Sequence, residues 1–410
     1  MNTYLIIILI FYVSIYFLET IIELLNISNL ESEIPEEFRD IYKKDDYKKS
    51  QNYLKETTRF SLLKTTFFTL ATLYFILIGG FNYLDIIIRN FNFGPLITGV
   101  LYIQLLIGGL SLVSIPFSLY STFYLEKKYG FNKTSLATYF LDFIKSTVLT
   151  FLIGSPVIYA LLWFFNSFNN MAWLYAWTFL VITQLIIMYI APTYIMPLFN
   201  KFIPLEEGEL KSKIETYAKQ HKFELNGLYK MDGSKRSTKS NAFFTGFGKN
   251  KRIVLFDTLI NKHSSDELLC ILAHEMGHYK LNHIQKGIII SIFTTGFMLF
   301  LLSLFLNNPQ LSAAFKLEKE SIYTSLVVFG FLFKPIEEII SILNNILSRK
   351  HEYEADEYAI KTTGLKLEFI TGLKKLSVDN LSNLKPHWLK VFIEYSHPPL
   401  LNRINAIKKI

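Results

Sequence analysis

Seven long apolar blocks constrain the fold of this chain more than any other feature of its sequence. A helix needs about 20 apolar residues to cross the ~30 Å hydrocarbon core of a bilayer, and each block reaches that length. The blocks are Tyr4–Leu25, Leu62–Ile88, Leu96–Leu125, Tyr139–Phe165, Met171–Leu198, Gly287–Leu306 and Ile322–Leu347. We therefore expect a mainly α-helical, multi-pass membrane protein with seven transmembrane helices.

Two other interpretations of the bulk sequence are weaker. The first block could be a signal peptide, but no basic segment precedes it and no small-residue cleavage site follows it. The net charge of +8 would suit a nucleic-acid-binding protein. However, the Lys and Arg residues lie largely beside the apolar blocks, which is typical of membrane topology. The sequence thus predicts membrane lipids, and no nucleic acid, as partners.

The segments between the blocks alternate in character, and this alternation predicts the orientation. Seven spans place the odd-numbered connections and the tail on one side of the membrane. Because these segments hold most of the Lys and Arg, we expect that side to be the cytosol and the N-terminus to lie across the membrane. The predicted parts are helices one to five with their loops (1–198), a soluble insertion (199–286), helices six and seven (287–347) and a cytosolic tail (348–410).

The soluble insertion has its own secondary-structure signals. Leu210, Ile214 and Ala218 are spaced as one face of an amphipathic helix. Residues 241–260 read as two strands joined by a Gly/Asn turn. Residues 264–283 follow as a helix, which Ser264 or its neighbour could cap. The insertion is therefore expected to contain a small β-sheet beside helices.

Within that last helix, the segment HEMGH has the spacing of a metal site. His274 and His278 fall one turn apart on the same face, so both imidazoles can reach one cation, with Glu275 beside them. In this arrangement two histidines bind zinc and the glutamate accepts a proton from water. The alternative is an amphipathic helix with solvated His and Glu side chains, but the apolar residues around the segment argue against it.

A catalytic zinc needs a third protein ligand, and the tail offers one. On a continuous helix His283 points away from the other two histidines, so we expect it to lie behind the ligands or at the surface and not to bind the metal. Glu352 and Asp356 are four residues apart and share a helix face, so one could bind the metal while the other holds a ligand histidine by its free ring nitrogen. Glu354 and Glu357 fall elsewhere on that helix and are expected to be solvated.

Three separated motifs carry a family resemblance. LAHEMGHYKLNH, SRKHEYEADEYA and YSHPPLLNRINAI together resemble the CAAX prenyl protease 1 family, the Ste24-type zinc metalloproteases of the M48 group. The likeness extends over nearly the whole chain, including the segments EKKYGFNKTS, MPLFNKFIPL and KSNAFFTGFGKNKRIVLFDTLI. The four-span HtpX-type proteases share the first two motifs but not this length or topology.

The resemblance implies a set of metal-site residues. His274, His278 and Glu352 match the zinc ligands of the family, with one ion per chain, and Glu275 matches its catalytic base. Asp356 matches the carboxylate that lies behind a ligand histidine.

The resemblance also implies residues that act beside the metal. Arg403 matches an arginine that pairs with that carboxylate, and His397 a histidine that contacts the substrate or the tetrahedral intermediate. Asn241 and Ala242 match the start of a strand edge along which the substrate peptide lies extended. The fold implied is a ring of seven helices around an intramembrane chamber, capped by a cytosolic zinc domain.

The expected function is therefore a monomeric zinc endopeptidase that removes the C-terminal tripeptide of prenylated CAAX peptides. A first alternative keeps the chemistry but makes the enzyme a quality-control protease of membrane proteins. A more remote alternative is a non-catalytic channel or scaffold, against which the intact set of ligands and base argues.

The source membrane is a separate expectation. The connection Asn307–Ser321 is short compared with eukaryotic members, the ending AIKKI lacks a dilysine signal in the usual register, and the composition is rich in Lys, Asn and Ile. These features favour a bacterial inner membrane, where the substrate need not be a prenylated CAAX protein.

Overall fold

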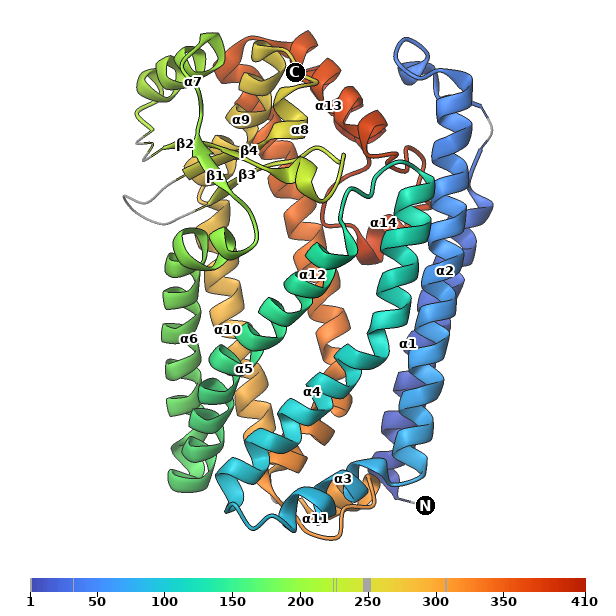
Figure 1. Ribbon diagram of the computed structural model, residues 1–410, viewed down its shortest axis with the longest axis vertical. Coiled ribbons are helices and arrows are strands. Elements are labelled where there is room, and N and C mark those ends of the chain that lie inside the picture. Colours follow the sequence, from blue (N-terminus) through green and yellow to red (C-terminus); the bar gives the residue numbers. More distant parts are fainter. Residues whose placement is uncertain (1, 32, 224, 226, 246–251, 307) are drawn as a thin grey trace.

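The computed structural model describes residues 2–31, 33–223, 225, 227–245, 252–306 and 308–410. Long helices run side by side over most of the molecule's length, and a smaller part with a β-sheet lies at the end opposite the N-terminus (Figure 1). The helices before the sheet are α1 (Thr3–Ser28), α2 (Lys44–Leu77), α3 (Gly80–Arg89), α4 (Pro95–Tyr120), α5 (Leu136–Ser167) and α6 (Ala172–Ile190). The later ones are α7 (Glu209–Gln220), α8 (Asp257–Ile260), α9 (Ser265–Lys280), α10 (His283–Phe305), α11 (Pro309–Ala314), α12 (Ile322–Thr363), α13 (Lys366–Asp379), α14 (Trp388–Glu394) and α15 (Leu400–Lys409).

Among the described residues, six helices are long and apolar enough to cross a membrane. They are Thr3–Ser28, Lys44–Leu77, Pro95–Glu126, Leu136–Ser167, Asn169–Leu198 and His283–Phe305. The seventh predicted span, Ile322–Leu347, is the first part of α12, where Lys334, Glu337 and Glu338 interrupt the apolar run. The multi-pass membrane class is confirmed, and the count of seven stays a prediction.

The second predicted span, Leu62–Ile88, was wrong in its extent. The helix α2 begins at Lys44, inside the expected first connection, and ends at Leu77. Gly79 then adopts a left-handed conformation (φ 77°) before α3 begins. A glycine takes this conformation without the steric cost of a Cβ, so the block is divided into two helices that a count of apolar residues cannot separate.

The connections predicted to share one side of the membrane do meet at one end of the bundle (Figure 1). Asn132 of the third connection forms a β-bridge with Ser237 of the fifth. Asp40, in the first connection, forms an ion pair of 3.0 Å with Lys374 of the tail. These contacts gather the odd-numbered connections and the tail around the sheet, while the chain's N-terminus lies at the other end.

The sheet has four strands in the order β1-β2-β4-β3. They are β1 (Phe202–Pro204), β2 (Leu228–Met231), β3 (Ala242–Thr245) and β4 (Arg252–Phe256). The two strands predicted within residues 241–260 are confirmed as the antiparallel pair β3 and β4. The Gly/Asn turn predicted between them falls in residues 246–251, outside the described residues. β3 is the edge strand nearest to α9, against which it packs.

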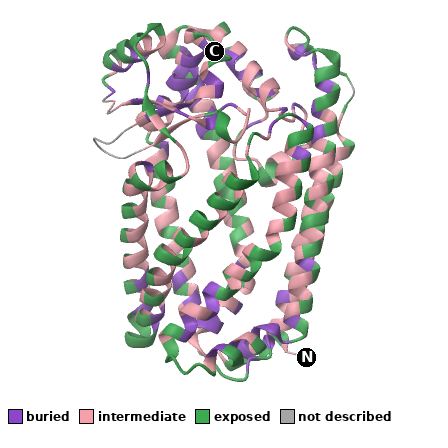
Figure 2. Cartoon of the chain, in the orientation of Figure 1, coloured by how far each residue is buried: buried purple, intermediate pink, exposed green. Residues whose placement is uncertain are grey.

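Buried residues concentrate at the two ends of the molecule (Figure 2). One apolar cluster includes Leu272, Met276 and Ile404 and surrounds α9. Another includes Ile8 and Phe315 and closes the opposite end. Between them, the long helices carry many exposed apolar side chains, as expected of surfaces that lipid covers. Ile214 and Ala218 of α7 belong to the first cluster, so the predicted amphipathic helix is confirmed.

Candidate metal centre

Two features of the helix α9 fix the position of the HEMGH segment. At its start, the backbone N–H of Glu267 donates to Ser264 Oγ, and the N–H of Ser264 donates to the Glu267 carboxylate, which forms a capping box. In the HEMGH segment, Gly277 lies against α12, where a Cβ would stand 3.3 Å from the Cα of Ala355. The glycine therefore lets the two helix backbones approach closely enough for a side chain of α12 to reach the histidines of α9.

Three side chains from these two helices converge on one point. The Nε2 atoms of His274 and His278 lie 3.1 Å apart. Glu352 places its Oε2 3.4 Å from the first of these nitrogens and its Oε1 3.2 Å from the second. The three residues form a group that could hold a metal ion.

These spacings test whether a metal fits the site. Two ligand atoms of a tetrahedral zinc with bonds of about 2.0–2.1 Å lie about 3.3 Å apart, and the Nε2–Nε2 separation of 3.1 Å is close to this, while Glu352 brings one oxygen near each nitrogen, at 3.4 and 3.2 Å. Oε2 of Glu352 is buried, and its neighbours His274 Nε2 and Arg403 Nη1, at 3.4 and 3.5 Å, are too far or too poorly aligned to give it a good hydrogen bond. A buried carboxylate oxygen without a good hydrogen bond is costly, and a cation would supply what it lacks. The residues present fit a metal of the zinc type.

The charges of the site favour a cation as well. Burial would raise the pKa of Glu352, but the two histidines outweigh it, so the pKa lies well below its usual range and the carboxylate is ionised. Burial lowers the pKa of His274, yet its hydrogen bonds with Asp356 and Glu352 prevail and raise the pKa to about 9. A metal entering at neutral pH must therefore displace a proton from His274.

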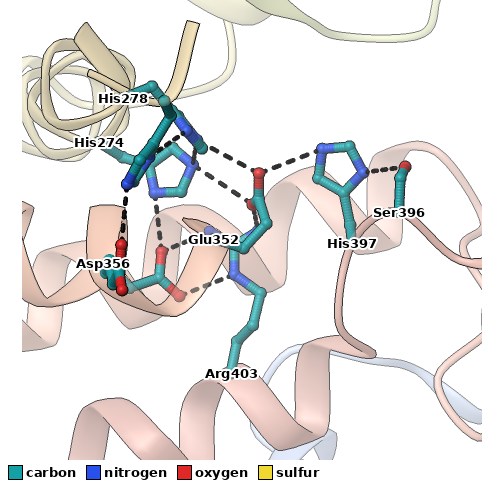
Figure 3. A network of polar contacts seen from close by, with 9 residues as sticks. His274, His278, Glu352, Asp356, Ser396, His397 and Arg403 are labelled. Carbon is teal, nitrogen blue, oxygen red and sulfur yellow. Dashed lines mark hydrogen bonds and ion pairs between the residues drawn. The ribbon is translucent and has the colours of Figure 1, made fainter. Parts of the chain in front are cut away.

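Behind His274 lies a buried ion pair (Figure 3). Asp356 Oδ1 is 2.8 Å from His274 Nδ1, and Arg403 donates to both oxygens of Asp356 at 2.9 and 2.6 Å. Arg403 Nη1 also lies 3.5 Å from Oε2 of Glu352. Burial would raise the pKa of Asp356, but the positive charge of Arg403 outweighs it and keeps the pKa below its usual value. Both carboxylates of α12 are thus held ionised and in place.

The other side of the site opens into a cavity of about 560 Å³. Glu275, His278 and Phe244 line it beside the metal position, and Ile290 and Leu347 line it between α10 and α12. The predicted base therefore faces a volume that a substrate can enter.

His397 lies at the rim of the metal position, with 67% of its side chain exposed. Its Nε2 is 3.4 Å from Oε1 of Glu352, and its Nδ1 is 2.9 Å from Ser396 Oγ (Figure 3). If the serine hydroxyl donates to Nδ1, the neutral ring carries its proton on Nε2, on the side that faces the metal position. The tail thus presents one hydrogen-bond donor toward the site.

Asn241 and Ala242 lie where β3 begins. The N–H of Phe256 donates to Asn241 O at 3.1 Å, which continues the pairing of β3 with β4 by one residue. Asn241 is exposed. Within the described residues β3 pairs on this side alone, so its other edge is available to an added strand.

Two side chains near the site behave differently from the sequence-based expectation. The predicted helix over residues 264–283 ends early, because Asn282 takes a left-handed conformation (φ 58°). His283 therefore does not point away: its Nδ1 is 3.1 Å from Nδ1 of His278. Glu354, expected to be solvated, lies 2.9 Å from Nε2 of His283. The signal that was missed is the asparagine itself, a residue type enriched in left-handed conformations.

Two family models together cover the chain. One is described as CAAX prenyl protease N-terminal, five membrane helices, and matches residues 5–201; the other is peptidase family M48 and matches residues 204–410.

Individual proteins match over similar lengths. CAAX prenyl protease 1 homolog of Mus musculus is 35% identical, over 92% of this chain and 88% of its own. CAAX prenyl protease 1 of Saccharomyces cerevisiae is 36% identical, over 92% of this chain and 89% of its own. The crystal structure of S. mikatae Ste24p superposes with a TM-score of 0.95 at 33% identity, covering 99% of both chains.

Proposed function

This chain belongs to peptidase family M48, in the branch with the CAAX prenyl protease N-terminal helices, and on that premise we propose that it removes the C-terminal tripeptide of prenylated CAAX peptides. It is a multi-pass membrane metallopeptidase. The observation that carries the proposal is the convergence of two histidines and one carboxylate, close enough to share one metal ion, beside a cavity and a strand edge that is unpaired within the described residues.

We assign His274, His278 and Glu352 to one Zn²⁺ per chain, since two imidazoles and a carboxylate are a donor set that zinc prefers. Three protein ligands leave a fourth position open. When these three residues hold the ion, it polarises the scissile carbonyl and lowers the pKa of a water in the fourth position from about 15.7 toward about 7. Asp356 and Arg403 keep His274 and Glu352 in position.

The remaining steps belong to side chains on the open side. Glu275 accepts a proton from the attacking water and delivers it to the leaving amine. His397 donates from Nε2 to the oxygen that becomes negative in the tetrahedral intermediate, in the tautomer whose Nδ1 accepts from Ser396 Oγ, 2.9 Å away. Glu275 lines the cavity, and His397 lies at the exposed rim beside Glu352.

The strand edge gives the substrate its orientation. A peptide laid along β3 from Asn241 and Ala242 would add a strand to the sheet, with main-chain hydrogen bonds that do not depend on sequence. The apolar walls of the cavity, including Ile290 and Leu347, would receive an aliphatic side chain or part of a lipid. Since one chain supplies every residue of this site, a monomer suffices for activity.

We place the site on the cytosolic face of a bacterial inner membrane, with the N-terminus across it. The Lys and Arg residues of the connections that gather around the sheet support this orientation. The short link between α10 and α12 supports a bacterial source.

The test uses the purified full chain in detergent, assayed for zinc, with two peptides of one sequence. One ends in a farnesylated Cys-aliphatic-aliphatic-X segment and the other lacks the lipid. We expect cleavage of the lipidated peptide alone, lost in Glu275→Gln. Equal cleavage of both peptides would indicate a general protease of membrane proteins. Cleavage of neither peptide by the zinc-loaded protein would overturn the proposal.

The ligand assignment has its own measurement. Glu352→Ala is expected to lose its zinc on dialysis, as elemental analysis would show. Glu357→Ala is the matched control, because Glu357 lies on the same helix and forms an ion pair with Lys361 at the surface, its one ion pair among the described residues. Full zinc content in Glu352→Ala would mean that another carboxylate is the ligand.

A further inference from the structure

The second metal-ligand histidine has a support of its own, built from residues that the proposed mechanism does not use. On a continuous helix, His283 would point about 140° away from His278. The left-handed residue Asn282 ends α9 and starts α10 at His283 in a new direction. Nδ1 of His283 then lies 3.1 Å from Nδ1 of His278. His283 is almost fully buried, and what remains of its surface lines the cavity beside His278.

If His278 binds the metal, only one placement of the protons on the two histidine rings is possible. Coordination through Nε2 requires the proton of the neutral ring to be on Nδ1. That N–H donates to Nδ1 of His283, which must therefore be the unprotonated nitrogen of its ring. The proton of His283 is then on Nε2, which lies 2.9 Å from Oε2 of Glu354. A carboxylate accepts it, and every polar atom in the row has a partner.

Glu354 is well placed to end this row. It lies two residues after Glu352 on α12, so one helix supports both the metal and the second histidine. Lys350, one turn earlier, places its Nζ 3.7 Å from the other carboxylate oxygen. His351 stacks on the ring of His283, with centroids 3.9 Å apart and planes within 9°. The stack fixes the plane of His283, and hence the direction of both of its nitrogens.

The same residues could be taken for a second metal site, since His283, His351 and Glu354 place one ligand atom each within 4.8 Å of one another. The ring geometry argues against it. The lone pair of an imidazole nitrogen lies in the plane of its ring, and the two rings are parallel and stacked. Their lone pairs therefore do not meet at a common ion. In contrast, the planes of His274 and His278 are 83° apart.

We propose that His283 and Glu354 are positioning residues that act through His278: the row Glu354–His283–His278 holds this ligand in the tautomer and orientation that the metal requires. The proposal rests on the ligand set assigned above. The support is the counterpart of Asp356 behind His274, but it is longer by one imidazole and reaches the protein surface at Glu354.

The experiment compares metal binding by the full chain in detergent with three substitutions. Glu354→Leu removes the acceptor, Glu354→Gln keeps an acceptor oxygen but loses the charge, and Glu357→Leu is the control on the same helix. Zn²⁺ affinity is measured by competition with a chelator, and the visible spectrum is recorded after loading with Co²⁺. Loss of a partner that orients a metal-bound histidine typically weakens metal binding about 10- to 100-fold.

We expect Glu354→Leu to bind Zn²⁺ about 10-fold more weakly and to shift the Co²⁺ bands, Glu354→Gln to fall between it and the wild type, and Glu357→Leu to match the wild type. His283→Phe, which keeps the stacking on His351, should reproduce the Leu result. If the affinity of Glu354→Leu is within twofold of the wild type and the Co²⁺ bands are unchanged, the role of the row Glu354–His283–His278 is overturned while the ligand assignment stands. Two ions per chain, one of them lost in Glu354→Leu, overturns that role in favour of a second metal site. A wild-type chain that binds no metal overturns both this proposal and the ligand assignment.

Discussion

The two sides of the metal centre differ in how they are packed. Behind the ligands, Asp356 and Glu352 are 1% and 4% exposed, and Arg403 fills the space between them. In front, His397 is largely exposed and Glu275 faces the cavity. The difference indicates a division of labour: the buried side fixes the charges that hold a cation, and the open side leaves room for a peptide and for the groups that move its protons. Metal content and turnover should therefore respond separately to substitution.

The largest effect is expected from Glu275→Gln on the open side. The amide cannot accept the proton of the attacking water, so turnover should fall by about 10²–10⁴-fold. Metal content should equal that of the wild type, because Glu275 is not among the three converging residues. Peptide cleavage and elemental analysis on one preparation provide both numbers. A variant that cleaves at the wild-type rate would remove Glu275 from the role of base.

His397→Gln tests the open side a second time. Losing a donor to the developing oxyanion typically costs about 10²–10³-fold in kcat, with little change in KM. Steady-state kinetics on the lipidated peptide would measure the two constants. Because Nε2 of His397 also lies 3.4 Å from Glu352, metal content is the necessary control. If the variant loses its metal while kcat per bound metal is unchanged, His397 helps to hold the cation, and the proposed separation of the buried and the open side does not apply to this residue.

Asp356→Asn tests the buried side. The substitution keeps the shape but removes the charge that Arg403 contacts through two hydrogen bonds and the carboxylate that faces Nδ1 of His274. We expect metal affinity to fall about 10- to 100-fold, and the melting temperature to fall as well, because breaking a buried pair costs about 3–5 kcal/mol. At saturating Zn²⁺ most of kcat should return. A kcat that stays low with the metal site full would assign Asp356 to the chemistry as well.

The smallest effect concerns Cys270, on a face of α9 that packs into the protein. Burial raises the pKa of its thiol from 9 to about 12. The pKa of the thiol is higher in the folded than in the unfolded chain, so the unfolded chain loses its proton first. The stability of the folded protein is therefore unaffected below pH 9 and decreases between pH 9 and about 12. At pH 8 a maleimide should leave the native thiol unmodified and label it after unfolding. Rapid labelling of the native protein would show that α9 is not packed as described.

Much of this site could be predicted because its spacing is local. His274 and His278 need only a helix, and the interval between Glu352 and Asp356 places both carboxylates on one face of another. The sequence does not reveal how the two helices cross, which depends on the contact of Gly277 with Ala355. Arg403 and His397 came from family resemblance alone, since nothing local to the tail ties them to α9.

The errors lie where the backbone conformation of one residue decides the outcome. Gly79 divides an apolar block into two helices, and Asn282 turns His283 back toward the metal position. A single left-handed residue does not change the hydrophobic periodicity of a sequence. It does change the direction of the side chain that follows. For this reason the direction of His283 and the contact of Glu354 with it were not predicted, although His283 was expected behind the ligands or at the surface.

One helix connects the membrane to the chemistry. With 42 residues, α12 is about 63 Å long, and its only proline, Pro335, lies in the part predicted to be the seventh span. The ring at that position removes one backbone hydrogen bond, so bending is concentrated there. Glu352 lies on the same helix beyond this proline, so a bend of α12 at Pro335 would displace a metal ligand relative to the histidines of α9. Lipid composition is therefore a variable that measurements of this enzyme have to hold constant.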